Sequence, residues 1–99
     1  MKPITEYQDY RQLMRDFYEE RKKSAYTWRE FSKAAGFSSP SYLKLVCDGK
    51  SSLSRVGVPC VAAAMDLSGF EYDYFSLLVE FGNAKDDEKK KKKYNQNKR

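Results

Sequence analysis

The sequence predicts an all-α fold, a compact bundle of five helices, and three observations support this prediction. Apolar residues recur at helical spacing along most of the chain. No segment alternates apolar and polar residues as a half-buried strand would, and Gly, Pro and Ser separate the apolar stretches. The expected helices cover about residues 5–22, 28–35, 40–48, 58–66 and 71–84. A chain of 99 residues forms one domain with a small, mostly local core.

The first helix is predicted from its start and its apolar stripe. Thr5 and Gln8 match the capping box, in which side chains satisfy the free N–H groups of a helix start. The stripe that follows is expected to face the core: Tyr7, Tyr10, Leu13, Met14 and Phe17.

Two short helices follow, with a sharp turn between them. Thr27 and Glu30 form a second capping box, and Gly36 can end the helix in the left-handed conformation. Ser39 is expected to cap the third helix, with Pro40 at its first position and Gly49 at its end. The expected inward residues are Phe31, Ala34 and Ala35, then Tyr42, Leu43, Val46 and Cys47.

In the fourth helix, Pro59 is compatible only with the first turn, so regular helix should begin at about Val58. Val61, Ala62, Met65 and Leu67 are expected inside. The fifth helix has an apolar side wider than a small core needs. A homodimer surface is therefore expected at Tyr74, Phe75, Leu78 and Phe81, or alternatively a dock for a further region of a longer chain. Residues 85–99 are expected to be a lysine-rich tail or linker, as frayed helix or disorder, after a domain of residues 1–84.

Charge is unevenly distributed. The whole net charge of +5 comes from residues 85–99, and residues 1–84 sum to zero. Within the domain, residues 21–55 carry eight basic and two acidic residues, whereas residues 56–84 carry four acidic residues and no basic one. Such asymmetry favours a polyanionic partner, because one side of the molecule is then attracted to it.

Several function classes are not expected. The chain has no histidine to act as a general base, and two cysteines without a CxxC motif argue against a metal site, so we expect no enzyme, metal, cofactor or small-molecule ligand. The sequence has no apolar run of about 18 residues for a membrane span and no secretory h-region at its start. A cytoplasmic protein with free thiols is expected.

The pair of helices at 28–35 and 40–48 predicts a helix-turn-helix, in which the second helix enters the DNA major groove. The segment FSKAAGFSSPSYLKLVCDGK resembles the Cro/repressor type of this motif. The matching residues are Phe31, Gly36, Ser38, Leu43, Val46, Gly49 and Lys50. Ser32 stands where alanine is usual, and one extra residue lies between Gly36 and Leu43.

A second resemblance covers most of residues 4–85. The segments ITEYQDYRQLMRDFYEERK, AGFSSPSYLKLVCDGKSSLS and EYDYFSLLVEFGNAK resemble the uncharacterised bacterial "Fsuc second" paralogous family, whose N-terminal part resembles a helix-turn-helix. This resemblance implies a role like that of a bacterial transcription regulator. Family members are usually longer, with a second region after the point where this chain ends.

The helix-turn-helix resemblance implies a set of double-stranded DNA contacts. The residues expected to face the bases are Ser39, Ser41, Tyr42 and Lys44. Those expected on phosphates are Thr27, Trp28, Arg29, Lys33, Lys50 and Arg55. Asp48 would repel phosphate, and Asn, Gln and Arg are absent from residues 38–50. The alternative is a protein-interaction module that keeps the helix-turn-helix shape without binding DNA.

Overall fold

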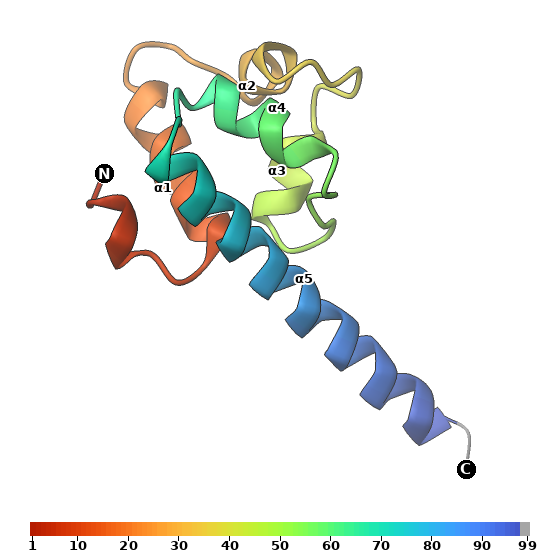
Figure 1. Ribbon diagram of the computed structural model, residues 1–99. Coiled ribbons are helices and arrows are strands. Elements are labelled where there is room, and N and C mark those ends of the chain that lie inside the picture. The colour runs from red at the N-terminus through yellow and green to blue at the C-terminus, as the bar shows by residue number, and fades with distance from the viewer. Residues whose placement is uncertain (98–99) are drawn as a thin grey trace.

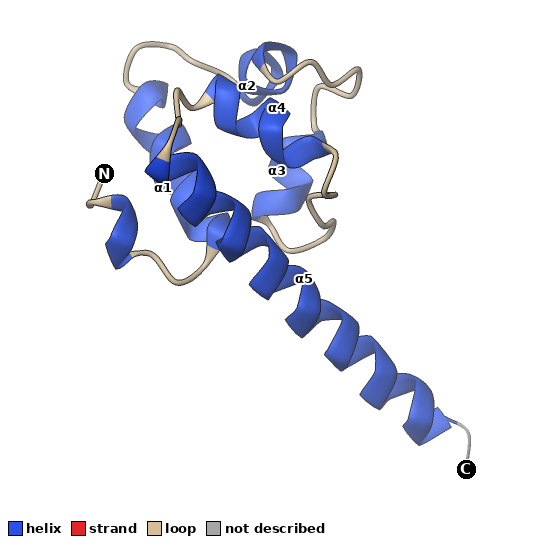
Figure 2. Cartoon of the chain, viewed as in Figure 1, coloured by secondary structure: helices blue, strands red, loops and turns tan. Residues whose placement is uncertain are grey.

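The computed structural model describes the backbone of residues 1–97 and the side chains of residues 1–88. Its regular elements are a 3-10 turn, η1 (Ile4–Glu6), and five α-helices: α1 (Tyr10–Lys22), α2 (Trp28–Ala34), α3 (Tyr42–Cys47), α4 (Gly57–Ala64) and α5 (Phe70–Asn97). Figure 1 shows α1 to α4 packed with the first half of α5, while the rest of α5 projects as a rod. No strand occurs in residues 1–97, as Figure 2 shows. The predicted all-α, five-helix fold is confirmed.

The predicted start of the first helix is wrong, because α1 begins at Tyr10 rather than at residue 5. Thr5 lies inside η1, and the cap of α1 is Asp9, whose side chain accepts a hydrogen bond from the Arg11 N–H. A long-range contact explains the break. The Tyr74 hydroxyl of α5 donates to the carbonyls of Thr5 and Tyr7, at 3.0 and 2.8 Å, so these carbonyls are bound to α5 instead of to the next turn of a helix.

The ends of α2 and α3 follow the predicted local signals. Thr27 Oγ1 accepts from the Glu30 N–H at 3.2 Å, which confirms this cap. Gly36 and Gly49 have φ of +86° and +80°, and each closes a Schellman motif. A side chain with a Cβ is disfavoured in this left-handed region, so both turns favour glycine.

The predicted start of α3 is wrong by two residues. The helix begins at Tyr42, its N-cap is Ser41 without a side-chain hydrogen bond, and Pro40 lies in the preceding turn. The buried Ser32 hydroxyl of α2 donates to the Pro40 carbonyl at 3.4 Å. That contact holds the turn against α2, so Ser39 does not cap the helix. It also gives Ser32, rather than the exposed Ala34, the inward position on α2.

The fourth helix starts at Gly57, close to the predicted position, with Pro59 in its first turn. Ser54 Oγ accepts from the Gly57 N–H at 3.2 Å. The helix ends at Ala64, because Asp66 adopts φ +58° and the Asp66 and Leu67 N–H groups bind the Ala63 and Ala62 carbonyls.

The fifth helix extends to Asn97 instead of ending at residue 84. Its core side carries Phe75 and Val79, which are almost fully buried, and Gly82, where an added Cβ would lie 2.7 Å from the Tyr10 ring. Because Phe75 and Leu78 are buried in the domain's own core, the predicted dimer surface is wrong for these two residues.

Candidate nucleic-acid interface

The candidate interface is built on α3, a helix too short to be stable alone. Leu43, Val46 and Cys47 are buried and fix its inner face, as the sequence predicted. Tyr42 is half-buried, with its ring 4.9 Å from that of Phe37 and its hydroxyl donating to the Ser52 carbonyl at 2.7 Å. The start of α3 is therefore held both to the turn before it and to the loop after it.

Two arginines of α1 hold the other end of α3. Arg11 Nε donates to the Val46 carbonyl at 2.8 Å, and Arg15 donates to the Cys47 carbonyl. These carbonyls belong to the last turn of α3, where carbonyls lack partners within the helix; the Val46 carbonyl also accepts from the Gly49 N–H at 3.1 Å. Cations at this negative end of the helix dipole add a favourable charge interaction. Sequence reasoning missed both residues, although their i, i+4 spacing beside the apolar stripe of α1 is a visible signal.

Arg11 also connects α3 to α5. Its Nη2 donates to the Ser51 carbonyl at 3.0 Å and to Asp86 Oδ2 at 3.1 Å. Asp86 also accepts from the Ser52 hydroxyl, and Asn83 donates to the Leu53 carbonyl at 3.0 Å. The segment after α3 is thus fastened to α1 and α5. Asp86, which makes two of these contacts, lies beyond residue 84, where the domain was predicted to end.

The outer face of α3 is exposed and carries paired charges. Ser41 and Lys44 are exposed, and Leu45 is 40% exposed beside them. Lys44 Nζ lies 3.0 Å from Asp48 Oδ2, and Arg15 lies 3.8 Å from the other Asp48 oxygen. The hydrogen bond from Lys44 lowers the pKa of the Asp48 carboxyl. The negative charge of Asp48 is therefore offset by two cations. Lys44 must break its ion pair with Asp48 to contact a ligand directly.

The remaining predicted base contact, Ser39, is exposed in the turn before α3. Of the predicted phosphate contacts, Trp28 is half-buried and stacked on Tyr18, with ring centroids 3.8 Å apart. Thr27 is exposed at the start of α2, where its hydroxyl serves as the cap.

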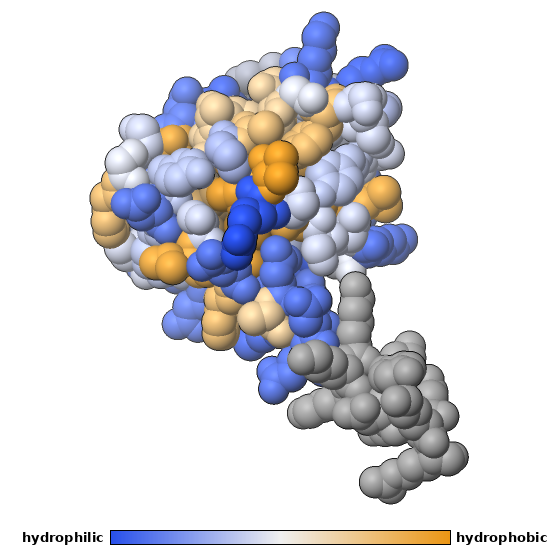
Figure 3. All heavy atoms as spheres, turned by 45° about the vertical axis from the view of Figure 1, so that its right-hand side comes forward, coloured by the Kyte–Doolittle hydropathy of each residue, from blue (hydrophilic) through white to orange (hydrophobic). Residues whose placement is uncertain are grey.

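The four cationic phosphate candidates are all exposed: Arg29, Lys33, Lys50 and Arg55. Arg55 lies 3.8 Å from Glu80, and the other three make no ion pair with any described side chain. Figure 3 shows one face of the molecule, on which small groups of hydrophobic side chains lie among hydrophilic ones.

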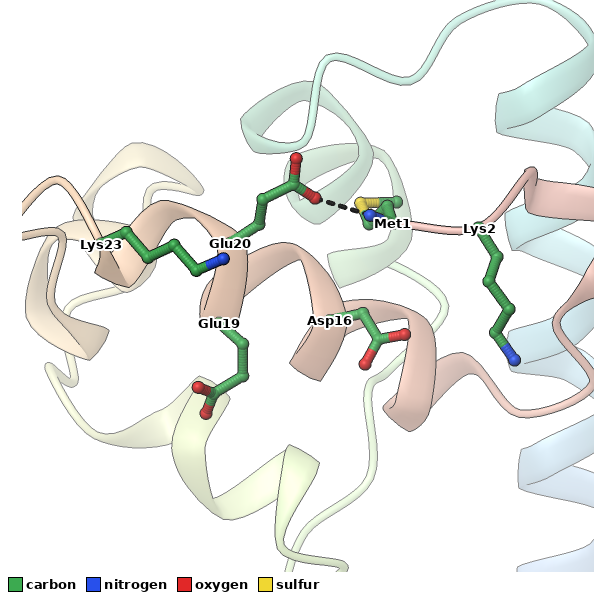
Figure 4. Close-up of a pocket in the computed structure, with 6 residues that line it drawn as sticks. All are labelled: Met1, Lys2, Asp16, Glu19, Glu20 and Lys23. Carbon is green, nitrogen blue, oxygen red and sulfur yellow. Dashed lines mark hydrogen bonds and ion pairs between the residues drawn. The ribbon is translucent and has the colours of Figure 1, made fainter.

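A hollow whose lining includes no residue of α3 lies at the N-terminus. It has a volume of about 510 Å³ and is lined by Met1, Lys2, Asp16, Glu19, Glu20 and Lys23. The Met1 amine and Glu20 form an ion pair at 2.8 Å across it (Figure 4). This contact lowers the pKa of Glu20. Of the other acidic groups that line the hollow, Asp16 accepts hydrogen bonds from the Tyr7 hydroxyl and from the Gln12 amide.

Comparisons of the chain with protein-family models, curated proteins and solved structures give no match. Within the described residues, no group of three or more Cys, Asp or Glu side chains is placed to hold a metal ion. None of the described helices is both long and apolar enough to cross a membrane.

Proposed function

We propose that the chain is a DNA-binding domain of a bacterial transcriptional regulator, with α3 entering the major groove. The observation that carries this proposal is the exposed outer face of α3, with Ser41 and Lys44 free of the core while both ends of the helix are fastened to the domain. A recognition helix has to be both exposed and rigid, because its side chains must reach base edges in a fixed register.

Charge supports the same proposal. The segment from residue 21 to residue 55 includes α2 and α3 and has a net charge of +6, with Arg29, Lys33 and Lys50 exposed and without ion pairs to described side chains. Phosphate contacts by such groups supply most of the affinity of non-specific DNA binding. In this proposal Lys44 exchanges Asp48 for a guanine or a phosphate.

The experiment is a titration of the chain against a random DNA duplex at several salt concentrations. The five lysines at 89–93 would bind DNA regardless of α3, so they are replaced by glutamine in every protein tested. Cutting the chain at residue 84 is unsuitable, because it removes Asp86 and its bond to Arg11.

In this background, Lys44→Glu is expected to weaken binding by about tenfold or more, since it removes a favourable interaction with DNA and adds repulsion. The matched control is Lys2→Glu, which changes the net charge equally at an exposed residue outside the basic segment. If Lys44→Glu and Lys2→Glu bind alike, α3 is not the contact surface. The slope of log affinity against log salt should also fall by roughly 0.9 for each phosphate that the variant no longer neutralises.

The second candidate is a protein-interaction module that keeps the helix-turn-helix shape. The observation that favours it is the exposure of two apolar side chains, Leu45 on α3 at 40% and Val56 at the start of α4 at 81%. An apolar interface depends little on salt, so a partner bound equally at low and high salt would favour this candidate.

A further inference from the structure

Helix α5 has a second apolar row that its own domain does not bury. Phe70, Leu77 and Phe81 are 63%, 63% and 53% exposed, and Tyr74 is half-buried between them. The four residues follow one another at intervals of four, three and four, the spacing of a coiled-coil seam. Because each residue of a helix turns by about 100°, the seam faces a different direction around the α5 axis from the core side, which is formed by Phe75 and Val79.

The seam borders a shaped groove. A hollow of about 330 Å³ lies between the seam and the segment before α1, lined by Tyr7, Gln8, Tyr74, Leu77, Leu78 and Phe81. Its shape is fixed, because the Tyr74 hydroxyl is bonded to the Thr5 and Tyr7 carbonyls. A large apolar side chain from another helix can fill such a groove without rearranging the domain.

The charges beside the seam indicate what packs there. One flank carries acidic residues at intervals of seven, Asp73, Glu80 and Asp87, and the other flank carries Glu71, Leu78 and Lys85 at the same interval. In a parallel pair of identical helices, Glu80 of one copy faces Lys85 of the other, because each flank meets the opposite flank five residues further along. In an antiparallel pair the acidic flanks face each other and repel.

The way in which the rest of the domain packs against α5 also favours a parallel pair. Leu78 lies on the flank of Lys85 and is buried against the body of the domain. In an antiparallel pair, the flank with Leu78 and Lys85 of one helix would face the same flank of the other helix. The remaining helices of the two domains would then lie on the same side of the pair. We infer that α5 pairs in parallel with α5 of a second copy through Phe70, Tyr74, Leu77 and Phe81. This inference concerns self-association and does not require DNA binding.

The pair Glu80–Lys85 is available for this contact. Glu80 is 58% exposed and lies 3.8 Å from Arg55, which is 90% exposed, so the existing ion pair is weak. Lys85 Nζ lies 4.8 Å from the centre of its own Phe81 ring. Pairing of Glu80 with a second copy would release Arg55, one of the predicted phosphate contacts.

The size of the seam implies weak association. The three exposed side chains offer roughly 100 Å² each, so two copies would bury on the order of 600 Å². A stable specific interface buries about 1,200 Å² or more. After Phe81 the seam positions are Ala84 and Glu88, so the apolar row ends there. In a parallel pair the lysines at 89–93 of both copies also repel each other.

The test is sedimentation equilibrium of the full chain without DNA, from about 10 μM to about 1 mM, because a weak dimer forms only in this range. The wild-type chain is expected to move from monomer toward dimer, and Leu77→Glu to stay monomeric. Val56→Glu is the matched control, since it places the same charge at an exposed apolar residue outside the seam and should dimerise like the wild type. Circular dichroism verifies that each variant is folded. A wild-type chain that is monomeric throughout, or equal dimerisation of Leu77→Glu, overturns the inference.

Charge variants test the parallel orientation. Glu80→Lys and Lys85→Glu should each weaken the dimer several-fold, and the double variant should restore it, because the attractive pair is re-formed with reversed signs. Replacing the lysines at 89–93 by glutamine should strengthen a parallel dimer. In an antiparallel dimer the lysine runs of the two copies would lie at opposite ends and not repel each other, so unchanged or weaker association of the glutamine variant refutes the parallel arrangement.

Discussion

Replacement of Arg11 by Met tests how the structure holds the candidate recognition helix. Met keeps much of the aliphatic packing but removes three hydrogen bonds, to the Val46 and Ser51 carbonyls and to Asp86. The Arg11 side chain is only 18% exposed, so water replaces these partners poorly. A hydrogen bond from a charged group contributes about 1.5–3 kcal/mol, and the three bonds share one guanidinium, so we expect a total loss of about 3 kcal/mol.

The loss is measured by urea unfolding, followed through Trp28 fluorescence and circular dichroism, which should give coincident transitions. For a domain of this size, 3 kcal/mol corresponds to a melting temperature lower by about 15 °C. Arg11→Lys should recover part of the stability, because an ammonium cannot span the same three acceptors. Arg29→Met is the control, since Arg29 is exposed and makes no hydrogen bond within the described residues.

A double-mutant cycle with Asp86→Asn isolates the contact to α5. Coupling of about 1 kcal/mol between the two sites is expected, because Asp86 and Arg11 are bonded directly. A loss below about 1 kcal/mol for Arg11→Met, or full stability of Arg11→Lys, would refute the claim that this guanidinium fixes the end of α3.

Two further predictions concern single residues. Ala25, in the turn after α1, has φ +66°, so Ala25→Gly should raise the free energy of unfolding by about 0.5–1 kcal/mol, whereas Ala63→Gly in α4 should lower it by a similar amount. Burial raises the pKa of the Cys47 thiol from about 9 to about 12. The folded chain therefore retains a proton that the unfolded chain releases, and stability should decrease as pH rises through this window. Urea midpoints of the wild type and Cys47→Ala against pH measure this effect; parallel curves would contradict it.

The sequence by itself determined features that depend on neighbouring residues. The cap at Thr27, the glycine turns at Gly36 and Gly49, and Pro59 in the first turn of α4 all follow from backbone geometry within a few residues. Helical periodicity also identified the buried side of α3, because it requires only the local rotation per residue. For the same reason Lys44 could be placed on the outer face.

Tertiary structure decided the features for which one segment offers two equivalent local solutions. The segment from Thr5 to Asp9 could continue α1, but Tyr74 binds its carbonyls and the helix begins later. The broad apolar side of α5 could be buried at Phe75 or at Leu77, and only packing against α1 and α4 places Phe75 inside and leaves Leu77 exposed. Arg11 acquires its role from Val46, Ser51 and Asp86, which are 35 to 75 residues away in the sequence. Contacts over such separations leave no local pattern, so only the folded chain brings them together.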